Sequence, residues 1–274
     1  MISLDAVKDY RVLVVGDAIR DRYVFVKPLG KSMKDSVIAV AHEREEVYRG
    51  GVWAAAGHLK DLCATVDVMH GPGVMLSTRF VEGQINRKLF TLHELRVEEA
   101  SEDFDVKSYD VVVVADFGYG TMTEALIERV SREARFLAVN AQTNSSNFGF
   151  NLITRYRRAD YVVIDETEAR LAAQDRTSDI EDVIMKLGYR KIVVTLGGNG
   201  AIGFEGCFYR EPARADVVVD TMGAGDAFLA VSAPFARSLP IGDLVAIGNA
   251  AGAAKVAVVG HRRAVGRADL GPRH

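Results

Sequence analysis

Short runs of β-branched and other apolar residues alternate along the chain with segments whose apolar residues recur at helical spacing. The runs predict buried strands at residues 11–16, 65–69, 110–115, 136–139, 161–164 and 191–195. The segments between them predict helices at residues 52–62, 123–133, 166–174 and 180–187. Two further helices, at residues 224–237 and 242–256, follow one another without a strand between them. This alternation is typical of a mainly parallel sheet with helices on both faces.

The pattern is broken between residues 22 and 48. Residues 23–27 and 37–41 predict strands joined by a Pro/Gly/Lys turn, and together with residues 87–97 they predict a small antiparallel sheet outside the main one. Because there is no internal repeat or low-complexity linker, we expect residues 1–274 to form a single domain. The last residues, 260–274, carry four arginines, three glycines and a proline, and we expect them to form a loose tail.

Composition excludes several classes of function. The chain has 274 residues, of which 49% are hydrophobic and 26% charged, and its net charge is −3. This composition predicts a soluble protein with a sizeable core and gives no reason to expect a nucleic acid or a membrane as partner. Cys63 and Cys207 are too few for a disulfide framework, and the first ten residues hold no apolar targeting segment. We therefore expect a cytoplasmic protein.

The chain's clearest chemical motif is the string from Asp220 to Asp226, Asp-Thr-Met-Gly-Ala-Gly-Asp, which precedes an apolar run. Small residues at a helix N-terminus let backbone N–H groups face an anion, and here they are Gly223, Ala224 and Gly225. The carboxylate of Asp226, in the first helical turn, lies beside that anion site as a candidate base. Phosphoryl transfer needs both an anion cradle and a base. Three small residues alone would more often mark a tight turn.

The whole string resembles the signature of the ribokinase-like (PfkB) carbohydrate kinases. Gly16-Asp17, with Asp21 and Tyr23 following, is most similar to the heptose-phosphate kinase branch, the kinase half of ADP-heptose synthesis. The resemblance covers residues 11–259. It implies a three-layer α/β/α sandwich with a mainly parallel sheet and a small antiparallel β lid, whose strands come from about residues 22–48 and 87–97.

The same resemblance implies a kinase that transfers the γ-phosphate of ATP to a hydroxyl of a sugar or sugar phosphate. The implied cofactors are ATP and Mg²⁺, and a monovalent cation such as K⁺ is also compatible with it. The implied partners are the small-molecule sugar and a second copy of the chain, in a homodimer formed through the lid.

The resemblance assigns the acceptor sugar to Asp21 and Asp17, after the first strand, and to Gly50 and Gly51, which would let the backbone approach it. Without the resemblance, Gly16-Asp17 at a strand end can be a simple turn, and Gly50-Gly51 can open a helix packed closely on the sheet. An asparagine that binds a sugar hydroxyl in the family is replaced here by Ala54.

The resemblance also assigns the nucleotide and the metal. The residues implied for the nucleotide are Thr195, Gly197, Gly200, Thr221 and Asn249. Glu168 is implied to orient water on Mg²⁺, with Asp165 in place of the family's asparagine. Acidic residues at a helix start also suit the helix dipole without any metal, and small residues near Asn249 also suit tight helix packing.

Three departures leave the acceptor open. Ala54 and Tyr119 replace a family asparagine and lysine, and the segment after Met69 is short. Arg79, with Arg87 and Lys88, can supply compensating charge or can be surface charge. A nucleoside or other small-molecule kinase, or a non-catalytic nucleotide- or sugar-binding descendant, therefore stay as alternatives. No serine-hydrolase, zinc-peptidase, Walker A or Cys-x-x-Cys motif is present, and the scattered histidines, His261 included, are expected to pack rather than bind.

Overall fold

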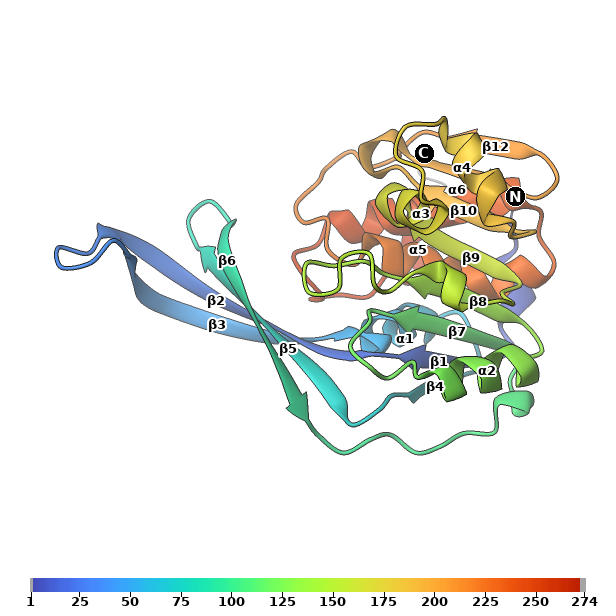
Figure 1. The fold of residues 1–274 in the computed structure, drawn as a ribbon, viewed down its shortest axis with the longest axis horizontal. Helices are drawn as coiled ribbons and strands as arrows, with labels where there is room; N and C mark the ends of the chain where they lie inside the picture. The colour runs from blue at the N-terminus through green and yellow to red at the C-terminus, as the bar shows by residue number, and fades with distance from the viewer. Residues whose placement is uncertain (1, 272–274) are drawn as a thin grey trace.

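An eight-stranded sheet forms the middle layer of the structure, a computed structural model that describes residues 2–271 (Figure 1). Its strand order is β12-β11-β10-β9-β8-β7-β1-β4. The parallel strands are β1 (Arg11–Gly16), β4 (Thr65–Met69), β7 (Val111–Asp116), β8 (Leu137–Ala141), β9 (Tyr161–Asp165) and β10 (Ile192–Thr195). At one edge, β11 (Ala201–Phe204) and β12 (Phe208–Glu211) pair antiparallel. The loops after the parallel strands therefore meet at one end of the sheet, where ligands bind in open α/β sheets.

Helices cover both faces of this sheet. One face carries α1 (Val52–Leu59), α5 (Ala224–Ser232) and α6 (Ile241–Val256), and the other carries α2 (Glu124–Glu133), α3 (Glu166–Ala173) and α4 (Ile180–Leu187). Successive strand side chains alternate between the two cores: Val12 and Val14 point into the first, Leu13 and Val15 into the second. Burial on both faces explains why the strands are continuous apolar runs, and the predicted parallel sheet is confirmed.

The predicted helix at residues 224–237 is interrupted. The α-helix α5 ends at Ser232 and continues as a 3-10 helix, η5 (Ala233–Arg237), with Pro234 in its first turn. Proline has no backbone N–H, so it cannot continue the α-helical hydrogen-bond ladder.

A second sheet, which we call the lid, extends away from the three layers (Figure 1). Its strand order is β3 (Ile38–Gly51), β2 (Ala18–Lys31), β5 (Gly73–Glu82) and β6 (Arg87–Val97). The two outer pairs are antiparallel, as expected, but the central pair of β2 and β5 is parallel. Tyr23, Phe25 and Val81 form a small core of its own under this sheet.

Two strands of the structure were not predicted, and two others were predicted too short. In β5, Ser77, Thr78 and Arg79 interrupt the apolar run, so periodicity gave no signal, yet all three are buried against the neighbouring strands. The short edge strand β12 was also missed. The lid strands β2 and β3 are longer than the predicted segments because their polar halves also pair with each other, well beyond the apolar residues.

The expected loose tail is wrong for residues 260–271, whereas residues 272–274 lie outside the described part of the chain. The Val265 N–H donates to His58 Nδ1 at 2.9 Å. The Arg267 side chain donates to Asp5 at 2.7 Å, and its backbone N–H donates to Asp61 at 2.7 Å. The segment therefore packs across α1 and onto the first turn of the chain. None of the helices between residues 2 and 271 is both long and apolar enough to cross a lipid bilayer.

Candidate active site

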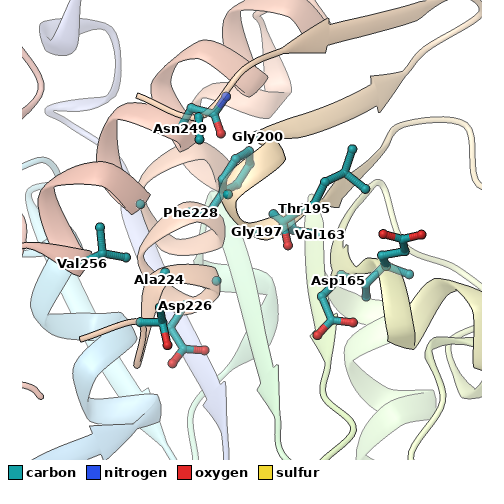
Figure 2. Close-up of a pocket in the computed structure, with 18 of the residues that line it drawn as sticks. Val163, Asp165, Thr195, Gly197, Gly200, Ala224, Asp226, Phe228, Asn249 and Val256 are labelled. Atoms are coloured by element: carbon teal, nitrogen blue, oxygen red, sulfur yellow. The ribbon is translucent and has the colours of Figure 1, made fainter. Parts of the chain in front are cut away.

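A cavity of about 600 Å³ lies at the carboxyl ends of β8, β9 and β10, between α5 and α6. It gathers all the residues that the sequence assigned to catalysis, nucleotide and metal. These are Asp165, Glu168, Thr195, Gly197, Gly200, Thr221, Gly223, Ala224, Gly225, Asp226 and Asn249. In Figure 2 the labelled residues lie around one open space, and the carboxylates of Asp226 and Asp165 lie at its lower side. The four residues assigned to the sugar do not line this cavity.

Unpaired backbone donors occur where α5 begins. Gly223 precedes the helix with φ +74°, a left-handed conformation that glycine adopts without strain. The Ala227 N–H is the first to bond in helical fashion, to Gly223 O at 3.0 Å, and the Ala224 N–H points back to Thr221 O at 3.4 Å. The N–H groups of Gly223, Gly225 and Asp226 have no partner among the described residues. The free donors thus differ by one residue from the expected set, with Asp226 in place of Ala224.

Asp226 is buried at the base of this cavity. Its Oδ1 accepts a 2.6 Å hydrogen bond from Gln142 Nε2, at the end of β8. Burial raises the pKa of the Asp226 carboxyl, and the charges of His261 and Lys255 and the Gln142 hydrogen bond oppose that rise. A carboxylate with a raised pKa and a second oxygen left free is suited to accept a proton. No motif in the sequence marks this contact.

The part of the cavity that the resemblance assigns to the nucleotide combines a glycine-rich turn with an apolar wall. A 3-10 turn, η4 (Gly197–Asn199), follows β10 directly and leaves Thr195 and Gly200 at the cavity. Asn249 on α6 donates to Glu211 O and Pro212 O at 3.4 and 3.3 Å, which holds the edge strand against the helix. Phe228 and Val256 add apolar surface (Figure 2). Such a mainly apolar cleft with a few polar groups suits a nucleotide base and ribose.

The two acidic residues that begin α3 differ in what they can offer a metal. Asp165 and Glu168 form a capping box: Asp165 Oδ1 accepts from the Glu168 N–H at 2.7 Å, and Glu168 Oε2 accepts from the Asp165 N–H at 2.8 Å. The second Glu168 oxygen accepts from the Thr143 N–H at 2.9 Å. Burial and then the charge of Asp165 raise the pKa of Glu168 to about 8. Asp165 is exposed and keeps Oδ2 for a ligand, so it is the better candidate of the pair.

The described residues contain no cluster of three or more acidic, histidine or cysteine side chains that would form a closed metal site. Mg²⁺ usually keeps several waters and takes one or two carboxylates together with substrate phosphates. A lone accessible carboxylate at Asp165 therefore fits this ion.

Asp17, which the resemblance assigns to the sugar, holds a backbone turn in the structure. Asp17 is fully buried, and it accepts hydrogen bonds from the backbone N–H groups of Phe117, Tyr119 and Thr121 at 2.9, 3.1 and 2.9 Å. Its two oxygens hold the turn that follows β7. Gly51 packs on this residue: at φ +58°, a Cβ there would strike Asp17 O. Packing therefore accounts for Asp17 and Gly51, and their assignment to the sugar stays a prediction.

Asp21 lies between two basic side chains. Its Oδ1 pairs with Arg79 Nη1 on β5, and its Oδ2 lies 3.3 Å from His261 Nε2. Burial alone would raise the pKa of the Asp21 carboxyl, but the His261 hydrogen bond and the charges of Arg79 and His261 outweigh it, so the pKa is lowered. A Cβ on Gly50 would collide with Asp21 Oδ2, so the glycine is needed to seat this carboxylate.

His261 joins the two halves of the site, although the sequence assigned it to a loose tail. Its ring is buried, and a Cβ on Gly223 would come within 2.8 Å of His261 Cε1. The ring therefore lies between Asp21 and the loop that begins α5. No periodicity or motif marks such a residue, because only the return of residues 260–271 to the domain brings it there.

The lid also contacts this loop. Asp220 Oδ1 accepts from Lys88 Nζ on β6 at 2.9 Å, and its Oδ2 accepts from the Gly260 N–H at 3.0 Å. Lys88 and Arg79, two of the three basic residues that the sequence considered, therefore lie near the site. The third, Arg87, pairs instead with Glu82 at the end of the lid.

Comparisons with known proteins identify the family. A model of the pfkB family of carbohydrate kinases matches residues 76–265. The bifunctional protein HldE of Campylobacter curvus is 24% identical over 297 residues, which cover 92% of this chain and 63% of that protein. The chain thus spans about six-tenths of the length of this curated relative.

Solved structures share the fold. Arabidopsis thaliana ribokinase, complexed with ribose and ATP, matches with a TM-score of 0.67 at 15% identity and covers 96% of this chain and 97% of its own. A nucleoside kinase from Methanocaldococcus jannaschii, an archaeal member of the ribokinase family, has a TM-score of 0.70 at 13% identity, with the same coverage of 96% and 97%. The ribokinase-like α/β fold expected from the sequence is confirmed.

Proposed function

The chain belongs to the pfkB family of carbohydrate kinases, and on that premise we propose that it transfers the γ-phosphate of ATP to a hydroxyl of a sugar or sugar phosphate of the heptose-phosphate kind. As a family member it is a phosphotransferase that acts on an alcohol group. The observation that carries the finer proposal is the position of Asp226: a buried carboxylate with one oxygen free, beside unpaired N–H groups, in a cavity of nucleotide size.

In the proposed reaction Asp226 accepts the proton of the attacking hydroxyl. The hydroxyl oxygen bonds to the γ-phosphorus, the bond from that phosphorus to the bridging oxygen breaks, and ADP leaves. Gln142 holds Asp226 Oδ1, so the proton goes to Oδ2. A positioned general base contributes roughly 10²–10⁴-fold to the rate.

The N–H groups of Gly223, Gly225 and Asp226 would neutralise the charge that develops on the transferred phosphoryl group. The turn with Thr195, Gly197 and Gly200 would hold the rest of the nucleotide. A bound Mg²⁺ would offset phosphate charge, and Asp165 is the carboxylate that would hold it through its free oxygen.

The acceptor would bind at the junction of the lid and the main sheet, next to Asp21. Arg79, His261 and Lys88 lie around this junction, where they contact the carboxylates of Asp21 and Asp220. Similarity to the bifunctional protein HldE supports a heptose-phosphate-like acceptor. Asp21 keeps the role that the sequence proposed for it, as the carboxylate nearest the acceptor.

We also propose a homodimer formed through the lid. Exposed apolar side chains are concentrated there, and Phe90 stacks on Phe80 with ring centroids 4.4 Å apart while it is 56% exposed. Other exposed apolar residues of the lid are Leu29, Val37, Ile38, Val47, Ile85, Leu92, Leu95 and Val97. An apolar surface of this extent is typical of a protein interface.

The test is an acceptor panel. The purified chain is incubated with ATP and Mg²⁺ and with sugars, heptose and hexose phosphates, or nucleosides, and ADP formation is followed while phosphorus NMR identifies the product. We expect a phosphorylated sugar or sugar phosphate. A product formed only from nucleosides would overturn the acceptor class, and nucleotide binding without turnover on any acceptor would overturn the catalytic proposal.

A further inference from the structure

Lys255 on α6 is completely buried, and it forms no ion pair with a described carboxylate within salt-bridge distance. Its Nζ donates instead to two backbone carbonyls, Met222 O at 2.9 Å and Gly260 O at 2.5 Å. A buried ammonium is costly unless its charge is compensated. Burial lowers the pKa of Lys255, and the nearby negative charges of Asp220, Asp226 and, less strongly, Asp21 oppose that effect.

The contact with Met222 fixes the direction of one anion-binding donor. A peptide unit is planar and trans, so its C=O and the following N–H point in opposite directions. With Met222 C=O turned toward Lys255, the Gly223 N–H is turned away from it, and Gly223 lines the cavity. The lysine chain also packs against the glycine, because a Cβ on Gly223 would lie 3.2 Å from Lys255 Cε.

The second contact ties this loop to the returning segment. Gly260 receives Lys255 at its carbonyl and donates its N–H to Asp220 Oδ2 at 3.0 Å. His261, the next residue, lies between Gly223 and Asp21. We call residues 220–226 the anion-binding loop. One ammonium group thus joins this loop to the segment that carries His261.

A monovalent cation such as K⁺ does not fit here. Carbonyl oxygens are the ligands that K⁺ takes in proteins, and the two carbonyls behind the loop already accept from Lys255. A K⁺ placed beside the ammonium would meet the repulsion of a like charge in a buried site. The sequence-based allowance for K⁺ therefore conflicts with the residues present.

We infer that Lys255 is a built-in cation of the anion-binding loop, which positions the Gly223 donor and makes phosphoryl transfer by this chain independent of K⁺. This inference rests on the proposed kinase function for its kinetic consequence, but not for the occupancy of the site. Lys255 is a positioning residue, since it acts through the loop and not on the reacting atoms.

Lys191 offers a matched control. Its Nζ also donates to two carbonyls, Ala236 O at 3.0 Å and Leu239 O at 3.1 Å, and it pairs with Glu205 at 2.9 Å. These contacts lie at the end of η5 and do not involve a residue that lines the cavity. Replacing Lys191 removes a similar lysine–carbonyl bridge without touching the anion-binding loop.

Occupancy is tested first in the unmodified protein, with no need for turnover. Crystals soaked in RbCl are measured at the rubidium absorption edge. We expect no anomalous peak within 3.5 Å of Met222 O or Gly260 O, and a rubidium ion there would overturn the inference. Failure of the proposed function leaves this result intact, because it does not depend on an acceptor.

The kinetic test compares ADP formation in KCl and in tetramethylammonium chloride at equal ionic strength. We expect the wild type to differ by less than about twofold between the two salts. Lys255→Ala should lose at least about tenfold in kcat in tetramethylammonium chloride and recover in KCl or NH₄Cl, whereas Lys191→Ala should stay indifferent to the salt. A wild type that K⁺ activates tenfold, or a Lys255→Ala loss that neither cation restores, would overturn the inference. If Lys255→Ala does not fold, the wild-type comparison and the rubidium soak decide.

Discussion

Replacing Gln142 with alanine should move the acid limb of the pH–rate profile to higher pH. Gln142 donates the one side-chain hydrogen bond that Asp226 accepts among the described residues, at 2.6 Å. That bond stabilises the ionised carboxylate and so opposes the burial that raises the pKa of Asp226. Without it the pKa rises further, and a larger share of the enzyme holds a protonated, inactive base.

The size of the effect follows from the chemistry of this contact. A hydrogen bond to a charged group is worth about 1.5–3 kcal/mol, and each 1.4 kcal/mol is about tenfold in an equilibrium. Well below the apparent pKa, the rate of Gln142→Ala should therefore fall by roughly 10- to 100-fold. On the alkaline plateau, where Asp226 is ionised in both proteins, the rate of the variant should be only a few-fold lower. Water that enters the space left by Gln142 would keep the loss of rate on the acid side at about 10-fold.

The assay is kcat/KM measured from pH 5 to 9 with a coupled ADP readout and the best acceptor of the panel. Asn147→Ala is the matched control, because Asn147 is an amide of the same segment that donates to Phe117 O at 2.8 Å and not to Asp226. An equal loss for Gln142→Ala at every pH, with an unmoved acid limb, would refute the reasoning that this amide tunes the base.

Two further predictions concern the lid and the buried turn. Phe90→Arg should shift the protein from dimer to monomer in light scattering after size exclusion. The control Phe148→Arg, at a residue that is 62% exposed in the main domain, should leave the dimer intact. A dimer in both variants would exclude the lid face that carries Phe90 as the dimer interface. Asp17→Ala leaves three backbone donors without their acceptor and should lower the free energy of unfolding in urea by at least about 2 kcal/mol. The control Asp9→Ala, at an exposed site, should lower it by less than about 0.5 kcal/mol. An equally small loss in both variants would contradict the structural role of Asp17.

The sequence predicted those parts of the fold that depend on local pattern. Strands buried on both faces are continuous apolar runs, so the sheet could be found without coordinates. The residues around the cavity were found through the resemblance of the string from Asp220 to Asp226 to the kinase signature, because three small residues alone would more often mark a tight turn. The lid strand β5 was not predicted because its polar residues Ser77, Thr78 and Arg79 are buried by other strands, and a single sequence does not reveal that burial.

The acceptor half was less predictable because its residues depend on long-range packing. Asp17 and Asp21 both follow the first strand closely in the sequence. The carboxylate oxygens of Asp17 accept from backbone N–H groups of a distant turn, whereas those of Asp21 contact Arg79 and His261. Lys255 lies in a run of small apolar residues, where the pattern predicted tight helix packing and gave no hint of a charge held by two carbonyls.

The measurement that tests the account most directly is the turnover of Asp226→Asn with the best acceptor, alongside calorimetric titration of the same variant with ATP. The substitution keeps the shape of the side chain and removes its capacity to take a proton. We expect a fall in kcat of at least about 10²-fold with an ATP dissociation constant within about threefold of the wild type. Near-wild-type turnover by Asp226→Asn would contradict the assignment of Asp226 as the base.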